Sequence, residues 1–138
     1  MQELGEDTSR KTIRGHISKS LSHAEKVMAT GTIQKNMVLL WDNPSPSSSF
    51  SGQSIQFSYS GYAFLLVLFD SNGIGDLATT FQVAQSGKSV TAWTYLNSVN
   101  RKREGSITAT GITFQNGIES GQTKNSIMVP LKVYGLRA

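Results

Sequence analysis

The sequence predicts an all-β protein: an antiparallel β-sandwich or jelly roll of seven to eight strands, preceded by a short N-terminal α-helix. Apolar residues recur every three or four positions before Gly31 and at every second position after it. Turn sequences rich in Gly, Asn, Ser and Pro then separate the apolar runs. Only 16% of the 138 residues are charged and 38% are hydrophobic, which favours a folded domain over a disordered chain.

The first segment, residues 1–30, is expected to hold an amphipathic helix. Thr8 or Ser9 can cap its start, and Gly31 follows its end. The apolar stripe is too narrow to stabilise the helix alone in water, so the helix must pack on its own β-domain or join copies of itself in a three-stranded bundle. We interpret this segment as serving attachment or oligomerisation, with a contact face made of Ile13, Ile17, Leu21, Ala24 and Met28.

The second segment, residues 31–138, is expected to form one β-domain. A first strand is predicted over 33–41, and a loop rich in serine and proline follows it. Apolar and polar residues alternate over 55–59, as in a half-buried strand. The nearly continuous apolar run over 62–69 predicts a central strand covered on both faces.

The remainder of the β-domain repeats this rhythm. The cluster Arg101-Lys102-Arg103 precedes Glu104 and Gly105 and predicts a solvated hairpin tip. Gly111 is expected to mark a bulge, and Pro130 to place the last strand at a sheet edge or in a bulge. Further strands are predicted over 78–84, 90–96, 106–114 and 127–134, with loops at 116–117 and 119–125.

Composition and charge argue against several partners. The net charge is +4, but Lys88 is the only basic residue between Asn36 and Asn100, so no basic stripe wide enough for nucleic acid is expected. No apolar run has the length of a membrane span. The chain has no cysteine, so disulfides and thiolate metal sites cannot contribute.

The sequence offers few catalytic groups. Both histidines, His16 and His23, lie in the predicted helix, so a Ser-His-Asp site within the β-domain is excluded. No spacing in the β-domain pairs two carboxylates for glycoside hydrolysis. We therefore expect a non-enzymatic protein without a cofactor or a metal. The carboxylates of the β-domain all fall in predicted loops: Asp42, Asp70, Asp76, Glu104 and Glu119.

One short motif resembles half of a calcium loop. Asp70, Asn72 and Asp76 place oxygen ligands around a glycine turn. The motif lacks the closing glutamate of an EF-hand, and a plain turn is the alternative.

Three aromatic residues are candidates for glycan contact. Trp41, Trp93 and Tyr95 would stack on sugar rings if they were exposed together, and Trp93 and Tyr95 share one face of a predicted strand. The alternative is that all three fill the core of the sandwich.

Three stretches of the β-domain resemble a known module. They read LWDNPSPSSSF at 40–50, SGYAFLLV at 60–67 and IMVPLKVYGL at 127–136. The first and last are similar to the "W-x-N-P-S-P" opening and "P-x-K-[IV]-Y-G-[IL]" close of a C-terminal β-module in virion structural proteins of phages and prophages of Gram-positive hosts. The resemblance covers residues 31–137.

The resemblance implies a tail-fibre, baseplate or head-fibre protein on the phage particle, commonly trimeric and without catalytic residues. We expect a β-head that projects from the particle, contacts other virion proteins and binds a host surface glycan. One alternative is a capsid head-fibre or decoration protein without a receptor role. Another is a carbohydrate-binding module. In either virion role, a short helix replaces the long shaft that often precedes the module.

Overall fold

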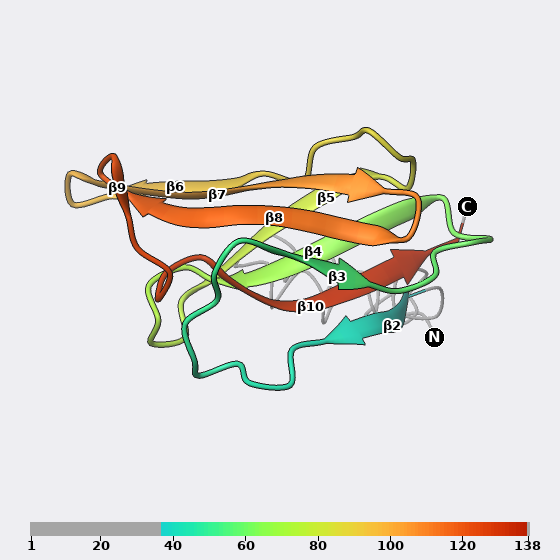
Figure 1. The fold of residues 1–138 in the computed structure, drawn as a ribbon, viewed down its shortest axis with the longest axis horizontal. Coiled ribbons are helices and arrows are strands. Elements are labelled where there is room, and N and C mark those ends of the chain that lie inside the picture. Colours follow the sequence, from blue (N-terminus) through green and yellow to red (C-terminus); the bar gives the residue numbers. More distant parts are fainter. Residues whose placement is uncertain (1–36, 138) are drawn as a thin grey trace, which may run out of the picture. The chain divides into compact units, whose positions relative to one another are not determined.

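A computed structural model describes residues 37–137 (Figure 1). This part of the chain is all-β and contains no helix, as the sequence predicted for it. The proposed contact face at residues 13–28, and the boundary placed after residue 30, lie outside the described residues. Residues 37–137 form nine strands where seven to eight were expected, the additional one being a two-residue strand.

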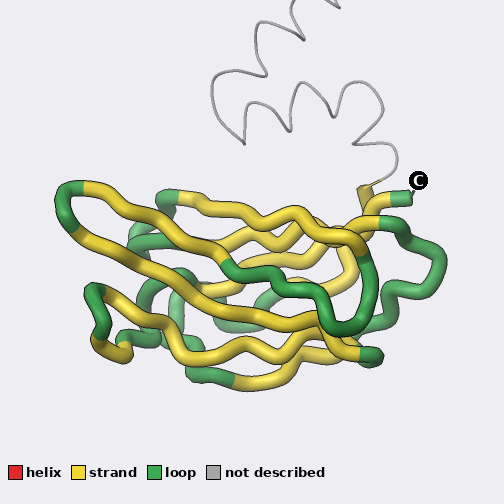
Figure 2. The backbone as a smooth tube through the Cα atoms, turned by 90° about the horizontal axis from the view of Figure 1, so that it is seen from above, coloured by secondary structure: helices red, strands yellow, loops and turns green. Residues whose placement is uncertain are grey.

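The strands form two antiparallel sheets, seen as two layers in Figures 1 and 2. The first sheet has the order β2-β10-β4-β5, and the second has the order β3-β8-β7-β6, with β9 beside β8. The strands of the first sheet are β2 (Met37–Asp42), β10 (Val129–Leu136), β4 (Phe64–Asp70) and β5 (Leu77–Val83). Those of the second are β3 (Gln53–Gln56), β8 (Gly111–Glu119), β7 (Val99–Thr108), β6 (Ala92–Leu96) and β9 (Gln122–Thr123).

The hydrophobic core draws on both sheets. Leu65, Val67 and Phe69 of β4 enter it from the first sheet, and Ile107 and Phe114 enter it from the second. The Phe114 ring packs edge-on against Phe69, with ring centroids 6.0 Å apart. Strand alternation explains this selection, because every second residue of β4 faces the opposite sheet.

Strand β4 is the central strand that the continuous apolar run predicted. It lies between β10 and β5, and all residues from Leu65 to Phe69 are buried. Leu66 and Leu68, which point away from the core, are each only 8% exposed. The strand is therefore covered on both faces.

The predicted basic hairpin tip is wrong. Arg101, Lys102 and Arg103 all lie within β7, and the tip is formed instead by Asn97 and Ser98, whose φ angles are 53° and 62°. Two positive φ angles in a two-residue connection match the tight hairpin turn that the twist of the strands favours. The basic residues are thus paired in the sheet, and Arg103 is fully buried.

The predicted strand over 106–114 is in fact two strands joined by a tight turn. Strand β7 ends at Thr108 and β8 begins at Gly111. A Cβ at Gly111 would lie 1.9 Å from the Ile55 carbonyl oxygen, so this glycine permits the close approach of β3 and is not a bulge. The bulge lies between Arg103 and Gly105.

Two other predicted segments also differ from the structure. Strand β3 stops at Gln56, so the alternating residues 57–59 are not in a strand, although the Phe57 amide donates to Thr110 O at 3.0 Å. The predicted loop at 116–117 belongs to β8. Pro130 was predicted to place the last strand at a sheet edge or in a bulge. The second alternative is confirmed, because the register of β10 shifts between Pro130 and Lys132, whereas β10 runs between β2 and β4 and is not an edge strand.

Candidate functional site

The opening and closing motifs of the resemblance come together in the fold, because the first begins at the end of β2, the last lies in β10, and β2 and β10 are neighbours in the first sheet. The buried Asn43 joins them: its side-chain amide donates to Pro130 O at 2.8 Å, and its backbone N–H donates to Leu131 O at 2.8 Å. Its Oδ1 accepts from Ser45 N at 2.7 Å, which shapes the proline-containing turn. The motif residues therefore fasten the irregular start of β10 to the end of β2.

The three candidate aromatic residues are separated by the fold. Trp93 and Tyr95 lie on the same face of the edge strand β6 and are 61% and 62% exposed. Trp41 is partly buried against the core and packs edge-on against Phe50, with ring centroids 6.3 Å apart. Its strand, β2, is the edge strand of the first sheet that lies farthest from β5, whereas β5 contacts β6. Only Trp93 and Tyr95 thus form an exposed aromatic pair.

The candidate calcium ligands hold their own loop together. Asp70 Oδ1 accepts from Gly73 N at 2.9 Å and from Gly75 N at 3.1 Å, while Asn72 Nδ2 donates to Asp76 Oδ2 at 2.6 Å. These bonds are typical of a tight turn in which Asp and Asn side chains cap backbone N–H groups. No cluster of three or more His, Asp or Glu side chains with metal-binding geometry occurs within residues 37–137.

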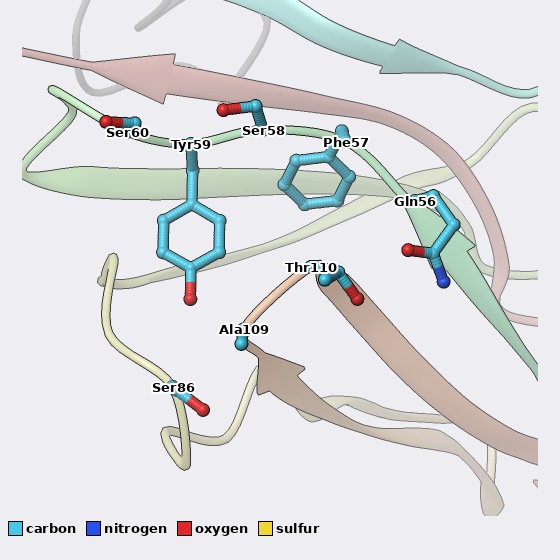
Figure 3. Close-up of a pocket in the computed structure, with 8 residues that line it drawn as sticks. All are labelled: Gln56, Phe57, Ser58, Tyr59, Ser60, Ser86, Ala109 and Thr110. Carbon is cyan, nitrogen blue, oxygen red and sulfur yellow. The ribbon is translucent and has the colours of Figure 1, made fainter.

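A wide groove of about 690 Å³ lies at the end of the domain that carries the β3–β4 loop and the β7–β8 turn (Figure 3). We call this the near end; β2, the first strand of the described residues, also begins there (Figure 1). Tyr59 donates its hydroxyl to Thr108 O at 2.7 Å, and its ring lies 6.2 Å from that of Phe57. Both rings point toward the β7–β8 turn. The groove escaped prediction because residues 57–59 alternate like a strand.

A second hollow, of about 490 Å³, lies between two hairpins at the opposite end, which we call the far end. One wall comes from the β4–β5 loop of the first sheet and the other from the β6–β7 hairpin of the second. We call it the far-end pocket. Its lining residues are Ser71, Asn72, Asp76, Leu77, Thr94, Leu96, Asn97, Val99 and Arg101.

The outer face of the first sheet carries exposed apolar side chains. Leu77, Phe81 and Val83 occupy alternate positions of β5 and are 47%, 56% and 43% exposed. Phe81 stacks on Phe64 of β4, with ring centroids 5.2 Å apart and planes 18° apart. Apolar side chains gathered on one sheet face are typical of surfaces that contact another protein segment.

The charged groups of the domain mostly serve its structure. Glu119 accepts from Lys124 at 3.0 Å and from Arg101 at 2.8 Å, and the hydrogen bond from Lys124 is the main reason that the pKa of Glu119 is lowered. Lys132 donates to Asp42 at 2.9 Å, which raises the pKa of Lys132. The carboxylates are thus engaged in ion pairs and turns at separate places.

Comparisons with known proteins identify no relative: neither a family model, nor a curated protein, nor a solved structure matches the chain. Within the described residues, no helix is long and apolar enough to cross a membrane.

Proposed function

We propose that this chain is a structural protein of a bacteriophage particle whose β-domain is a non-catalytic module exposed on the particle surface. The observation that carries the proposal is the pairing of the two motif segments. The opening motif begins at the end of β2 and continues into the loop that follows, the closing motif lies in β10, and the fold places β2 beside β10 with Asn43 fastening them. The similarity therefore concerns one structural unit and not two unrelated short matches.

The finer description follows from the same proposal. The domain is a β-sandwich, and the consecutive pairing of β6, β7 and β8 favours a sheet with a meander over a jelly roll. The protein is a trimeric fibre or tail-tip component, with Ile13, Ile17, Leu21, Ala24 and Met28 forming its assembly face. The exposed apolar face around Phe81 supports contacts with other virion proteins.

The test is a density map of the intact virion together with light scattering on the purified chain. The proposal expects density for the β-domain on the outer surface of the particle and a trimer in solution that becomes monomeric without residues 1–30. A monomer in both cases would exclude the assembly role of the helix. Attachment to capsids without any binding to host cells would favour the decoration protein.

A second candidate, a carbohydrate-binding module, is favoured by the exposed pair Trp93 and Tyr95. Two aromatic rings at alternate positions of an edge strand offer flat apolar surfaces for sugar rings. Trp93→Ala should abolish signal on a glycan array, whereas Leu39→Ala on β2, outside the far-end pocket, serves as a control for loss of an exposed apolar side chain. Equal signal from Trp93→Ala and the unchanged protein would remove this pair from consideration.

A further inference from the structure

We infer that the far-end pocket binds a neutral saccharide. This inference rests on the proposed role of the β-domain at the particle surface and names the ligand class that one of its sites would take. The pocket lies at the end opposite the start of β2, the first strand of the described residues. Its volume of about 490 Å³ falls within the ordinary range for small-molecule sites.

An unpaired hydroxyl is the first observation. Thr94 lines the pocket, and its Oγ1 is closed off from solvent without any hydrogen-bond partner in the described domain, the only such buried side-chain atom found there. A buried polar atom without a partner costs free energy and calls for a physical explanation. A ligand hydroxyl supplies that partner once rotation about the Thr94 χ1 angle turns Oγ1 toward the pocket.

A partly satisfied guanidinium is the second observation. Arg101 donates through Nε to Glu119 Oε2 at 2.8 Å, and no other hydrogen bond of this side chain occurs among residues 37–137. Its Nη donors therefore remain for a ligand in the pocket that Arg101 lines. The Arg101 side chain is only 21% exposed, so the donors are held in a restricted position.

The far-end pocket also has a preformed wall. Asn72 Oδ1 accepts from Ile74 N at 3.0 Å and from Asp76 N at 3.3 Å, and Asn72 Nδ2 donates to Asp76. These bonds fix the β4–β5 loop before any ligand arrives, which reduces the entropy lost on binding. They leave Asp76 Oδ1 as a hydrogen-bond acceptor on this side of the pocket.

The chemistry of the lining selects the ligand class. Asp76 and Arg101 carry opposite charges, and Glu119 already compensates Arg101, so an anionic ligand would meet the Asp76 carboxylate without a spare cation. Leu77, Leu96 and Val99 provide apolar surface beside these polar groups. A neutral saccharide matches this mixture, because its C–H faces contact apolar side chains while its hydroxyls both donate and accept.

In the experiment, isothermal titration calorimetry measures the affinity of the full 138-residue chain for neutral oligosaccharides of glucose, galactose, mannose and N-acetylglucosamine. Thr94→Val removes the unpaired hydroxyl at nearly constant volume. Asn97→Gly removes an amide from the rim, and glycine readily adopts the φ of 53° found there. Thr79→Val is the matched control for Thr94→Val, since Thr79 lies on the other sheet and outside the pocket. Trp93→Ala tests whether the exposed aromatic pair binds the saccharide instead.

The expected result is that Thr94→Val and Asn97→Gly each weaken binding about fivefold or more, as the loss of a hydrogen bond implies. Thr79→Val and Trp93→Ala should leave the affinity unchanged. Thr94→Val should also keep or raise the Tm of the free protein, because it deletes a buried hydroxyl that has no partner. If the Thr94 hydroxyl instead stabilised the fold, Thr94→Val would lower the Tm.

Two results would overturn the inference. Binding that is lost in Trp93→Ala but retained in both pocket variants would assign the saccharide to the outer face of β6, and the proposed surface role would stand. Absence of binding to every neutral member of the panel, or binding only to an added polyuronate, would exclude the neutral-saccharide site. The virion map tests the proposed function independently of these outcomes.

Discussion

Arg103 should be the charged residue on which the stability of the β-domain depends most. Its side chain is fully buried, yet it forms no ion pair with a carboxylate of residues 37–137. The guanidinium instead donates to three backbone carbonyls: Nε to Met128 O at 2.7 Å, Nη1 to Gln115 O at 2.8 Å and Nη2 to Ile127 O at 3.1 Å. Burial without a counter-ion lowers the pKa of Arg103 to about 10.

The neighbouring residues explain how the fold accommodates this cation. Gly117 lies opposite Arg103 on β8, and a Cβ there would be 2.9 Å from Arg103 Nη2. The Phe50 ring lies 5.3 Å from the guanidinium carbon and adds a cation–π contact. Arg103 therefore ties β7 to β8 and to the segment that leads into β10.

Replacing Arg103 by methionine should destabilise the domain by about 2–6 kcal/mol. Two of the three hydrogen bonds, those to Met128 and Ile127, are buried, and each buried acceptor left unpaired costs about 1–3 kcal/mol. Removal of a desolvated charge offsets part of this cost, so we expect the lower half of the range. A small domain has only about 5–15 kcal/mol of stability in total.

Arg103→Lys should be at least as harmful as Arg103→Met. Lysine keeps the buried charge and its ammonium is more strongly hydrated, but it cannot reproduce the fork that reaches three carbonyls. Urea unfolding at pH 7 measures both variants. Lys102→Met, at the partly exposed neighbouring position, is the control and is expected within about 0.5 kcal/mol of the unchanged protein. A lysine variant as stable as the unchanged protein would refute the geometric argument, and a methionine variant of equal stability would show that the carbonyls find other partners.

Two further predictions concern the sheet and its ion pairs. Gly111→Ala should lower the free energy of unfolding in urea by more than about 4 kcal/mol, because its Cβ would lie 1.9 Å from Ile55 O. Gly87→Ala has open space around it and should lower that free energy by only roughly 1–2 kcal/mol, the cost of a left-handed residue. Similar values for the two variants would refute a steric cause. Glu119→Gln should lower stability at neutral pH and lose its effect in acid. The lowered pKa of Glu119 means that its contribution is present above the ordinary glutamate pKa and disappears as the pH falls through the folded-state value. A difference that persists below that value would contradict this assignment.

Strong periodic patterns of apolar residues predicted the strands well, but no pattern in the sequence predicted which polar groups are buried. The run over 62–69 predicted β4 because a strand covered on both faces needs apolar residues at every position. Arg103 was predicted to lie in a solvated turn, because clusters of basic residues are normally exposed to solvent, but its side chain is buried. Its partners are backbone carbonyls, and a sequence contains no sign of where a carbonyl lacks a donor.

For the candidate sites, too, the sequence predicted local features but not those that depend on how the two sheets pack. Strand alternation correctly placed Trp93 and Tyr95 on one face, but it could not say whether that face was the core, because this depends on which strands lie across from β6. The far-end pocket was not foreseen as a whole. Asp76 and Arg101 stand 25 positions apart in the sequence, and only the packing of two hairpins from different sheets brings them to one hollow.

Strand β6 concentrates the candidate binding groups of the domain. Because successive residues alternate in direction, Trp93 and Tyr95 face outward while Thr94, between them, lines the far-end pocket. The exposed apolar face around Phe81 belongs to the other sheet. The apolar face and the far-end pocket share only Leu77, so a partner bound over Phe81 would leave Thr94 and the β6–β7 wall of that pocket uncovered. It follows that Phe81→Ser should impair assembly without changing saccharide binding, and that Thr94→Val should weaken saccharide binding without changing assembly. A shared surface would not allow this separation.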